Sequence, residues 1–101
     1  MNPKIKVLMV DDEAQFRATT ERILTRRGFQ TIMAASGEEA IEKLDQNPDV
    51  VVLDIKMPGM DGHATLHEIK KRRSELPVII LTGHGALPSA REARDKGAVA
   101  C

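Results

Sequence analysis

The feature that most constrains this chain is the regular alternation of short apolar runs with segments of helical periodicity. Apolar runs of strand length occupy residues 5–10, 29–34, 50–53 and 78–81, and another opens at residues 98–101. In the segments between them, apolar residues recur every three or four positions, as on one face of a helix. Strands that alternate with helices require right-handed crossovers, which place helices on both faces of a parallel sheet. We therefore expect an α/β fold with a doubly wound, mostly parallel sheet.

Local signals set the ends of the predicted helices. The first helix begins near Glu13, and Gly28 supplies the left-handed residue at its end. Ser36 and Glu39 have the spacing of a capping box at the start of the second helix. Asp61 can cap a third helix, and a fourth is predicted over residues 89–96. Each predicted helix then connects two strands, as the alternation requires.

Length and composition limit the classes of function that are open. A chain of 101 residues suits one small domain, which we expect over residues 1–101. A formal net charge of zero gives no basic excess for nucleic acid, and no apolar run is long enough to cross a membrane. A single cysteine fits a reducing cytoplasm. The lack of Trp and Tyr argues against stacking platforms for bases or flavins.

Aspartates follow two strands that the expected topology makes neighbours. Asp11 and Asp12 follow Val10, and Asp54 follows Leu53. In a sheet of order 2-1-3-4-5, the first and third strands flank the point where the winding reverses, and ligands bind there. Taken singly, each aspartate is better explained as a turn residue or helix cap, but those roles do not explain the coincidence of all three.

Carboxylates gathered at one edge need compensation, because each pair at about 4 Å repels by roughly 4 kcal/mol at an effective dielectric of about 20. Either one carboxylate keeps its proton, or a cation lies among them. We favour a cation, and Mg²⁺ is the ion that binds a few carboxylates while leaving positions for phosphate oxygens. Thr82 ends the next strand and precedes Gly83, so its hydroxyl and a backbone amide can donate hydrogen bonds to an anion there.

The chain resembles the receiver domain of two-component response regulators, in the segments VLMVDDE, VVLDIKMPGMDG and PVIILTG. These segments follow the order and approximate spacing of that family, and the resemblance covers the whole chain. It implies a flavodoxin-like sheet of order 2-1-3-4-5 and a phosphoprotein of phosphorelay signal transduction. Asp54 would accept a phosphoryl group from a sensor histidine kinase. Asp11, Asp12, Asp54 and the backbone carbonyl of Lys56 would hold Mg²⁺, and Thr82 would contact the phosphoryl group and switch.

The implied activity is stoichiometric, because the phosphorylated chain acts as a signal to an output domain or downstream protein. Such a chain at most removes its own phosphoryl group and is not a turnover enzyme. A metal-dependent hydrolase on a similar sheet is an alternative. Enzymes of that kind commonly carry a second carboxylate two residues after the nucleophile, and this chain has Lys56 there. Zinc at His63 and His67 is a weaker alternative, since no cysteine cluster or suitably spaced acid accompanies them.

One departure from the family pattern concerns the end of the sequence. The family carries a lysine at the end of the fifth strand, followed by a fifth helix, whereas this sequence ends at Cys101, before the place expected for that lysine. We therefore expect an incomplete fifth strand, no fifth helix, and a C-terminally incomplete receiver. An exposed strand edge favours a homodimer or a swapped edge. A receiver-shaped interaction module that is not phosphorylated stays open as the alternative function.

Overall fold

The main sheet is parallel throughout and has the predicted strand order. The computed structural model describes residues 4–57, 60–81 and 99–100. Its five-stranded sheet contains β1 (Lys6–Val10), β2 (Gln30–Ala34), β3 (Val50–Asp54), β6 (Val78–Leu81) and β7 (Val99–Ala100). The order is β2-β1-β3-β6-β7, with every neighbouring pair parallel. The predicted order 2-1-3-4-5 is confirmed, and the fifth strand is the short β7.

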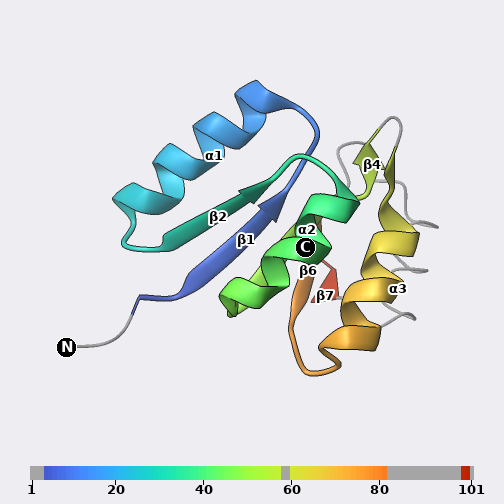
Figure 1. The fold of residues 1–101 in the computed structure, drawn as a ribbon. Coiled ribbons are helices and arrows are strands. Elements are labelled where there is room, and N and C mark those ends of the chain that lie inside the picture. The colour runs from blue at the N-terminus through green and yellow to red at the C-terminus, as the bar shows by residue number, and fades with distance from the viewer. Residues whose placement is uncertain (1–3, 58–59, 82–98, 101) are drawn as a thin grey trace.

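Helices cover both faces of this sheet, as doubly wound topology requires (Figure 1). The helix α1 (Ala14–Arg26) lies on one face against β2. The helices α2 (Gly37–Lys43) and α3 (Gly62–Arg72) pack side by side on the other face. A 3-10 turn, η1 (Leu44–Gln46), extends α2 toward β3. The predicted fourth helix lies outside the described residues.

The helix ends follow the sequence signals with one adjustment. Gly28 follows α1 with φ +93°, the left-handed conformation that glycine adopts without strain. The Ser36 hydroxyl accepts a hydrogen bond from the Glu39 N–H at 3.0 Å, so half of the predicted capping box is present. The Glu39 carboxylate accepts from the N–H of Ala35 rather than from that of Ser36. The box is thus displaced by one residue, and the cap still joins the start of α2 to the end of β2.

The hydrophobic core fills the space between the sheet and the pair α2–α3. On the strands it consists of alternate residues, none more than 7% exposed: Leu8, Val10, Ile32, Ala34, Val51, Leu53, Val78 and Ile80. Leu66 and Ile69 of α3 belong to this core and are fully buried. The strand alternation therefore sends one set of side chains into this core and the other set toward α1.

A second, two-stranded sheet separates β3 from α3. The strands β4 (Lys56–Met57) and β5 (Met60–Asp61) pair antiparallel. The helix α3 starts directly after Asp61, at the predicted place. A Cβ on Gly62 would lie 2.7 Å from the Cα of Ile55, so only glycine allows this close approach. No helix in the described ranges is long and apolar enough to cross a membrane.

Candidate functional site

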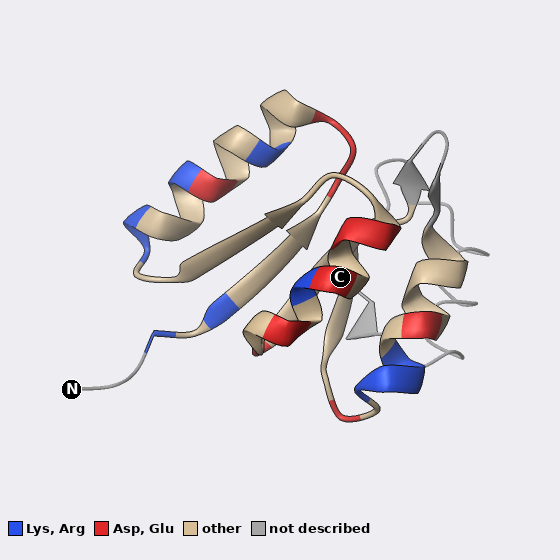
Figure 2. Ribbon diagram, in the orientation of Figure 1, with Lys and Arg blue, Asp and Glu red and all other residues tan. Residues whose placement is uncertain are grey.

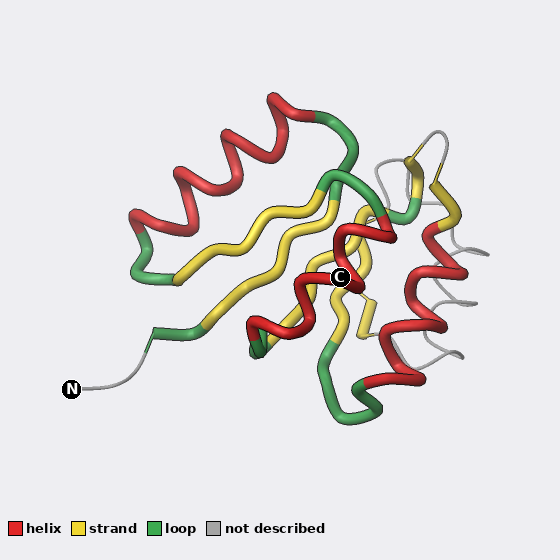
Figure 3. Tube along the Cα trace, in the orientation of Figure 1, coloured by secondary structure: helices red, strands yellow, loops and turns green. Residues whose placement is uncertain are grey.

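The candidate site lies at the carboxyl ends of β1 and β3. Val10 of β1 pairs with Leu53 of β3, so Asp11 and Asp54 are the next residues on adjacent strand tips. The connections that follow β1 and β2 run at this same edge (Figure 3). Because side chains alternate along a strand, Asp54 lies with Val52 on the face of the sheet that carries α1. The same alternation along β1 places Asp11, at the neighbouring strand tip, on that face. The strand-end arrangement predicted from the sequence is therefore present.

Asp11 is held at the strand tip by its own local hydrogen bonds, which explains how a carboxylate can end a buried strand. Its side chain is only 3% exposed, and its Oδ1 accepts from the N–H of Glu13 at 2.9 Å. Its backbone N–H donates to the carbonyl of Ala34 at 3.0 Å. In the described part of the chain, its second oxygen, Oδ2, accepts no hydrogen bond. One carboxylate oxygen of Asp11 is thus used by the turn.

The other two aspartates are more open, Asp12 being exposed and Asp54 half-exposed. Among the residues that the structure describes, no three His, Cys, Asp or Glu side chains gather closely enough to form a metal-binding group. The donor set is nevertheless chemically suited to Mg²⁺, which prefers oxygen ligands, uses one or two carboxylates and keeps several waters. The magnesium site stays a prediction.

The remaining predicted site residues are only partly within the described structure. Lys56 opens β4 two residues after Asp54 and pairs with Asp61, so its backbone lies in the hairpin that leaves the β3 tip. Leu81 is the strand partner of Asp54, and Thr82 directly follows it in the sequence. Thr82 itself, like Gly83 and Cys101, lies outside the described residues.

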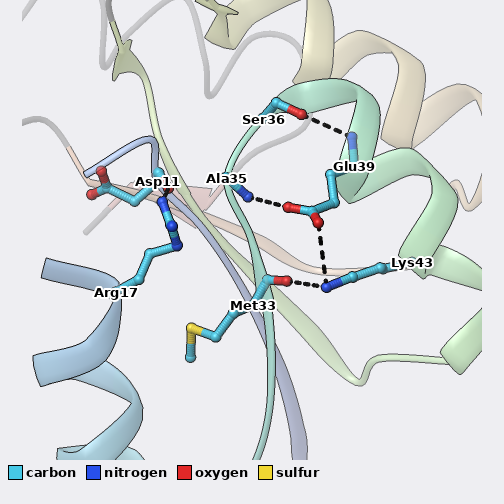
Figure 4. Close-up of polar contacts among 7 residues, drawn as sticks. All are labelled: Asp11, Arg17, Met33, Ala35, Ser36, Glu39 and Lys43. Carbon is cyan, nitrogen blue, oxygen red and sulfur yellow. Dashed lines mark hydrogen bonds and ion pairs between the residues drawn. The ribbon is translucent and has the colours of Figure 1, made fainter. Parts of the chain in front are cut away.

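Arg17 of α1 is a contact of this edge that the sequence did not reveal. Its Nη1 donates to the backbone carbonyl of Asp11 at 2.6 Å, and the side chain is half-buried (Figure 4). Charge-assisted hydrogen bonds of this kind are short and strong. The sequence signal was available, because Arg17 lies one helical turn after Glu13 and therefore at the same end of α1 as the acidic pair.

Charges of both signs meet at this edge. Acidic residues occupy the connection from β1 to α1 and the first turn of α2 (Figure 2). The pKa of Glu39 is held below its ordinary value of 4.5, first by the hydrogen bond from Ala35 and then by the positive charges of Lys43 and Arg17. Lys43 also donates to the carbonyl of Met33, which ties α2 to β2. Cations from two helices, Arg17 of α1 and Lys43 of α2, therefore favour the ionised form of Glu39.

A hollow of about 460 Å³ lies at the opposite edge of the sheet. Its lining runs from Pro48 and Asp49, before β3, to the segment Arg72–Pro77, before β6. Two of its cations are already engaged, since Arg72 pairs with Glu68 and Arg73 donates to the carbonyl of Leu44. This hollow lies at the edge of the sheet opposite to Asp11, Asp12 and Asp54, and it takes no part in the candidate site.

Comparison with known proteins identifies the class to which this fold and edge belong. The response regulator receiver domain family matches residues 7–101, and the chain belongs to that family. It is 45% identical over 91 residues to the DNA-binding transcriptional regulator NtrC of Klebsiella pneumoniae, covering 89% of this chain and 19% of that protein. The chain thus spans about a fifth of the length of that relative. The resemblance stated from the sequence motifs is confirmed.

Two further relatives are closer in length. The chain is 37% identical over 95 residues to sporulation initiation phosphotransferase F of Bacillus subtilis, covering 93% of this chain and 77% of that protein. Among solved structures, it resembles a chain of the CheX–CheY complex with BeF3 and Mg²⁺ from Borrelia burgdorferi. The TM-score is 0.85 at 37% identity, and the match covers 93% of this chain and 73% of that chain.

Proposed function

We propose that this chain is a phosphoacceptor switch in which Asp54 takes a phosphoryl group from a sensor histidine kinase. The observation that carries the proposal is the position of Asp54 at the tip of β3, directly beside the acidic tip of β1, in a member of the receiver family. Half-exposure of Asp54 leaves room for a donor to approach. The same residue serves as acceptor whether the donor is a protein phosphohistidine or a small phosphoramidate.

The proposed reaction transfers a phosphoryl group from an imidazole nitrogen of the donor histidine to a carboxylate oxygen of Asp54. A carboxylate oxygen of Asp54 attacks the phosphorus, the P–N bond to the donor histidine breaks, and the electron pair returns to the imidazole nitrogen. The product is an acyl phosphate, a covalent intermediate that carboxylates form in other phosphotransfer proteins. The loose transition state needs positioning and charge stabilisation more than acid–base chemistry. A rigid strand tip provides the positioning.

Mg²⁺ is the cofactor that we propose for this reaction. Asp11 through Oδ2, Asp12, Asp54 and the backbone carbonyl of Lys56 would hold it. When bound, the ion supplies neutralisation of the charge on the transferring phosphoryl group. Two observations support this choice: the oxygen donors at the strand tips, and the Mg²⁺ in the similar CheX–CheY complex.

Phosphorylation would act as a signal and not as a step of turnover. The added group brings roughly −1.5 to −2 charges, enough to bias a two-state segment, and Thr82 is the residue that we propose responds to it. The output would be a further segment or a second protein, as in regulators where a receiver occupies only part of the length. Within this proposal, residues 1–101 act as one cytoplasmic receiver unit that contacts neither DNA nor membrane directly. Self-association through the edge strand β7 belongs to the same proposal.

Intact-mass spectrometry after incubation with Mg²⁺ and a phosphoramidate donor tests the acceptor role. We expect a gain of one phosphoryl group in the parent chain and no gain in Asp54→Asn. Asp45→Asn, a change at an exposed aspartate of η1, is the matched control and should behave as the parent. Binding of Mg²⁺ without any mass gain, also in a version extended through the lysine expected after Cys101, would instead support an interaction module. Release of more than one phosphate per chain from an ester would support a hydrolase.

A further inference from the structure

Arg17 connects the first helix to the acidic tip of β1 by a single contact. The contact runs from Nη1 to the carbonyl oxygen of Asp11, at 2.6 Å. That carbonyl belongs to the peptide group that joins Asp11 to Asp12. A strong donor on this oxygen therefore fixes the plane of the peptide and, with it, the direction in which Asp12 leaves the strand.

The Arg17 bond is one of three that anchor Asp11. The backbone N–H of Asp11 donates to Ala34 of β2, and its Oδ1 accepts from the nearby N–H of Glu13. The first bond holds the residue to the sheet, and the second closes the turn upon itself. Of these three bonds, all between described residues, the Arg17 bond is the one that comes from the body of a helix and from a positively charged donor. In the part of the chain that the structure describes, the other nitrogens of Arg17 donate no hydrogen bond.

The charge and the hydrogen bond of Arg17 have opposite consequences for a cation at this edge. A guanidinium near the carboxylates repels Mg²⁺, so removal of its charge alone should make Mg²⁺ bind more tightly. Removal of the hydrogen bond releases the Asp11–Asp12 peptide, so the ligands lose their orientation and Mg²⁺ should bind more weakly. The sign of the change in affinity therefore shows which effect dominates.

We propose that Arg17 is a positioning residue that orients the Asp11–Asp12 peptide for cation binding beside Asp54. This inference rests on the proposed function, since it concerns the same edge and the same ion. Residues that orient metal ligands typically change metal affinity by about tenfold or more when they are replaced. Because the bond is partly buried and charge-assisted, we expect roughly a tenfold loss of Mg²⁺ affinity without it.

Three variants separate the roles. Arg17→Met removes the charge and the donor but keeps an unbranched side chain as far as the position of Nε, and Arg17→Lys keeps the charge and a donor group. Arg22→Met removes an exposed arginine from the same helix and serves as control. The measurements are the Mg²⁺ dissociation constant by calorimetry, the unfolding midpoint in urea, and metal-free hydrogen exchange at the amide of Glu13, the partner of Asp11 Oδ1.

For Arg17→Met we expect roughly tenfold weaker Mg²⁺ binding and faster exchange at Glu13. Arg17→Lys should recover most of the affinity, and Arg22→Met should match the parent in both measurements. A general loss of packing would instead lower the urea midpoint of Arg17→Met and leave the affinity of its folded fraction unchanged, and that result overturns the inference. So does Mg²⁺ binding in Arg17→Met that is equal to or tighter than in the parent.

The two proposals can fail separately. A parent chain that binds Mg²⁺ and is phosphorylated, together with an Arg17→Met variant that does the same equally well, removes the role of Arg17 alone. A parent chain that neither binds Mg²⁺ nor takes a phosphoryl group removes the proposed function and this inference together. In the second case, unchanged exchange at Glu13 in Arg17→Met would further show that the contact does not hold the turn at all.

Discussion

The two faces of the main sheet differ in how completely their side chains are buried. On the face under α2 and α3, the strand side chains of the core are at most 7% exposed, and both helices contribute buried residues. On the face that carries α1, Val7 and Met9 of β1 are buried, but Val52 of β3 and Ile79 of β6 are only half-buried, and α1 itself contributes no buried residue. Phe16 and Ile23 of α1 are 42% and 48% exposed. The first face therefore supplies most of the packing energy.

The difference shows how a small chain can combine a stable frame with an adaptable edge. Asp54 falls on the less packed face and is half-exposed, whereas Asp11 on the neighbouring tip is buried. The backbone that carries them is fixed from the other side by Leu53 and Val10, both fully buried. The packed face thus sets the position of the strand tips, while the side chain of Asp54 stays partly open to solvent.

The largest expected effect comes from a pair of matched isoleucines, one on each face. Ile69→Ala removes a fully buried side chain of α3 and should lower the free energy of unfolding by about 2–5 kcal/mol. Ile23→Ala removes a half-exposed side chain of α1 and should cost less than about 1 kcal/mol. Urea denaturation followed by far-UV circular dichroism measures both, since the chain has no Trp or Tyr. Equal losses would show that the faces do not differ.

Two glycines extend the comparison to the backbone. A Cβ on Gly62, at the start of α3, would lie within 3 Å of the Cα and the carbonyl oxygen of Ile55, so Gly62→Ala should cost about 1–3 kcal/mol. Gly28, at the end of α1, has no atom within 4 Å of such a Cβ, and only its φ of +93° opposes a side chain. Gly28→Asn should therefore cost less than Gly62→Ala, because asparagine tolerates left-handed backbone. The same denaturation curves decide the order, and a costlier Gly28→Asn would contradict it.

The smallest expected effect concerns the cap of α2 and its dependence on pH. The lowered pKa of Glu39 means that its ionised form stabilises the fold above pH 4.5, its ordinary value, and that this contribution is lost as the pH falls through the folded pKa. Because the side chain of Glu39 is 41% exposed, solvent screens its interactions, and Glu39→Gln should cost less than about 1 kcal/mol at pH 7. The cost should disappear in acid. Glu42→Gln, at an exposed position of the same helix, is the control and should show no such change.

The sequence was sufficient for the topology because the relevant signals are local. Branched apolar runs mark the strands, and Gly28, Ser36 and Asp61 mark helix boundaries that the structure confirms to within a residue or two. The strand order followed from these elements, because parallel crossovers of one hand leave few arrangements. The adjacency of Asp11 and Asp54 was then a consequence of register and not an independent fact.

The arrangement of side chains at the carboxyl ends of the strands could not be predicted from the sequence, because it depends on which of several hydrogen-bond partners each group takes. The three aspartates were expected to converge, but one oxygen of Asp11 is used by the N–H of Glu13, an equally ordinary role for an aspartate before a helix. The contact of Arg17 depends on how closely α1 packs on the sheet, which periodicity does not specify. The pairing of β4 with β5 and the close approach of Gly62 to Ile55 are likewise contacts that the apolar pattern does not specify.

The most direct test of the central claim is to locate the phosphoryl group chemically. Borohydride reduces an acyl phosphate to the alcohol, so a phosphorylated aspartate becomes homoserine, while free carboxylates do not react. After incubation with Mg²⁺ and phosphoramidate, followed by reduction and peptide sequencing by mass spectrometry, we predict homoserine at position 54 and nowhere else. Homoserine at Asp11 or Asp12, or phosphorylation that survives in Asp54→Asn, would contradict the account.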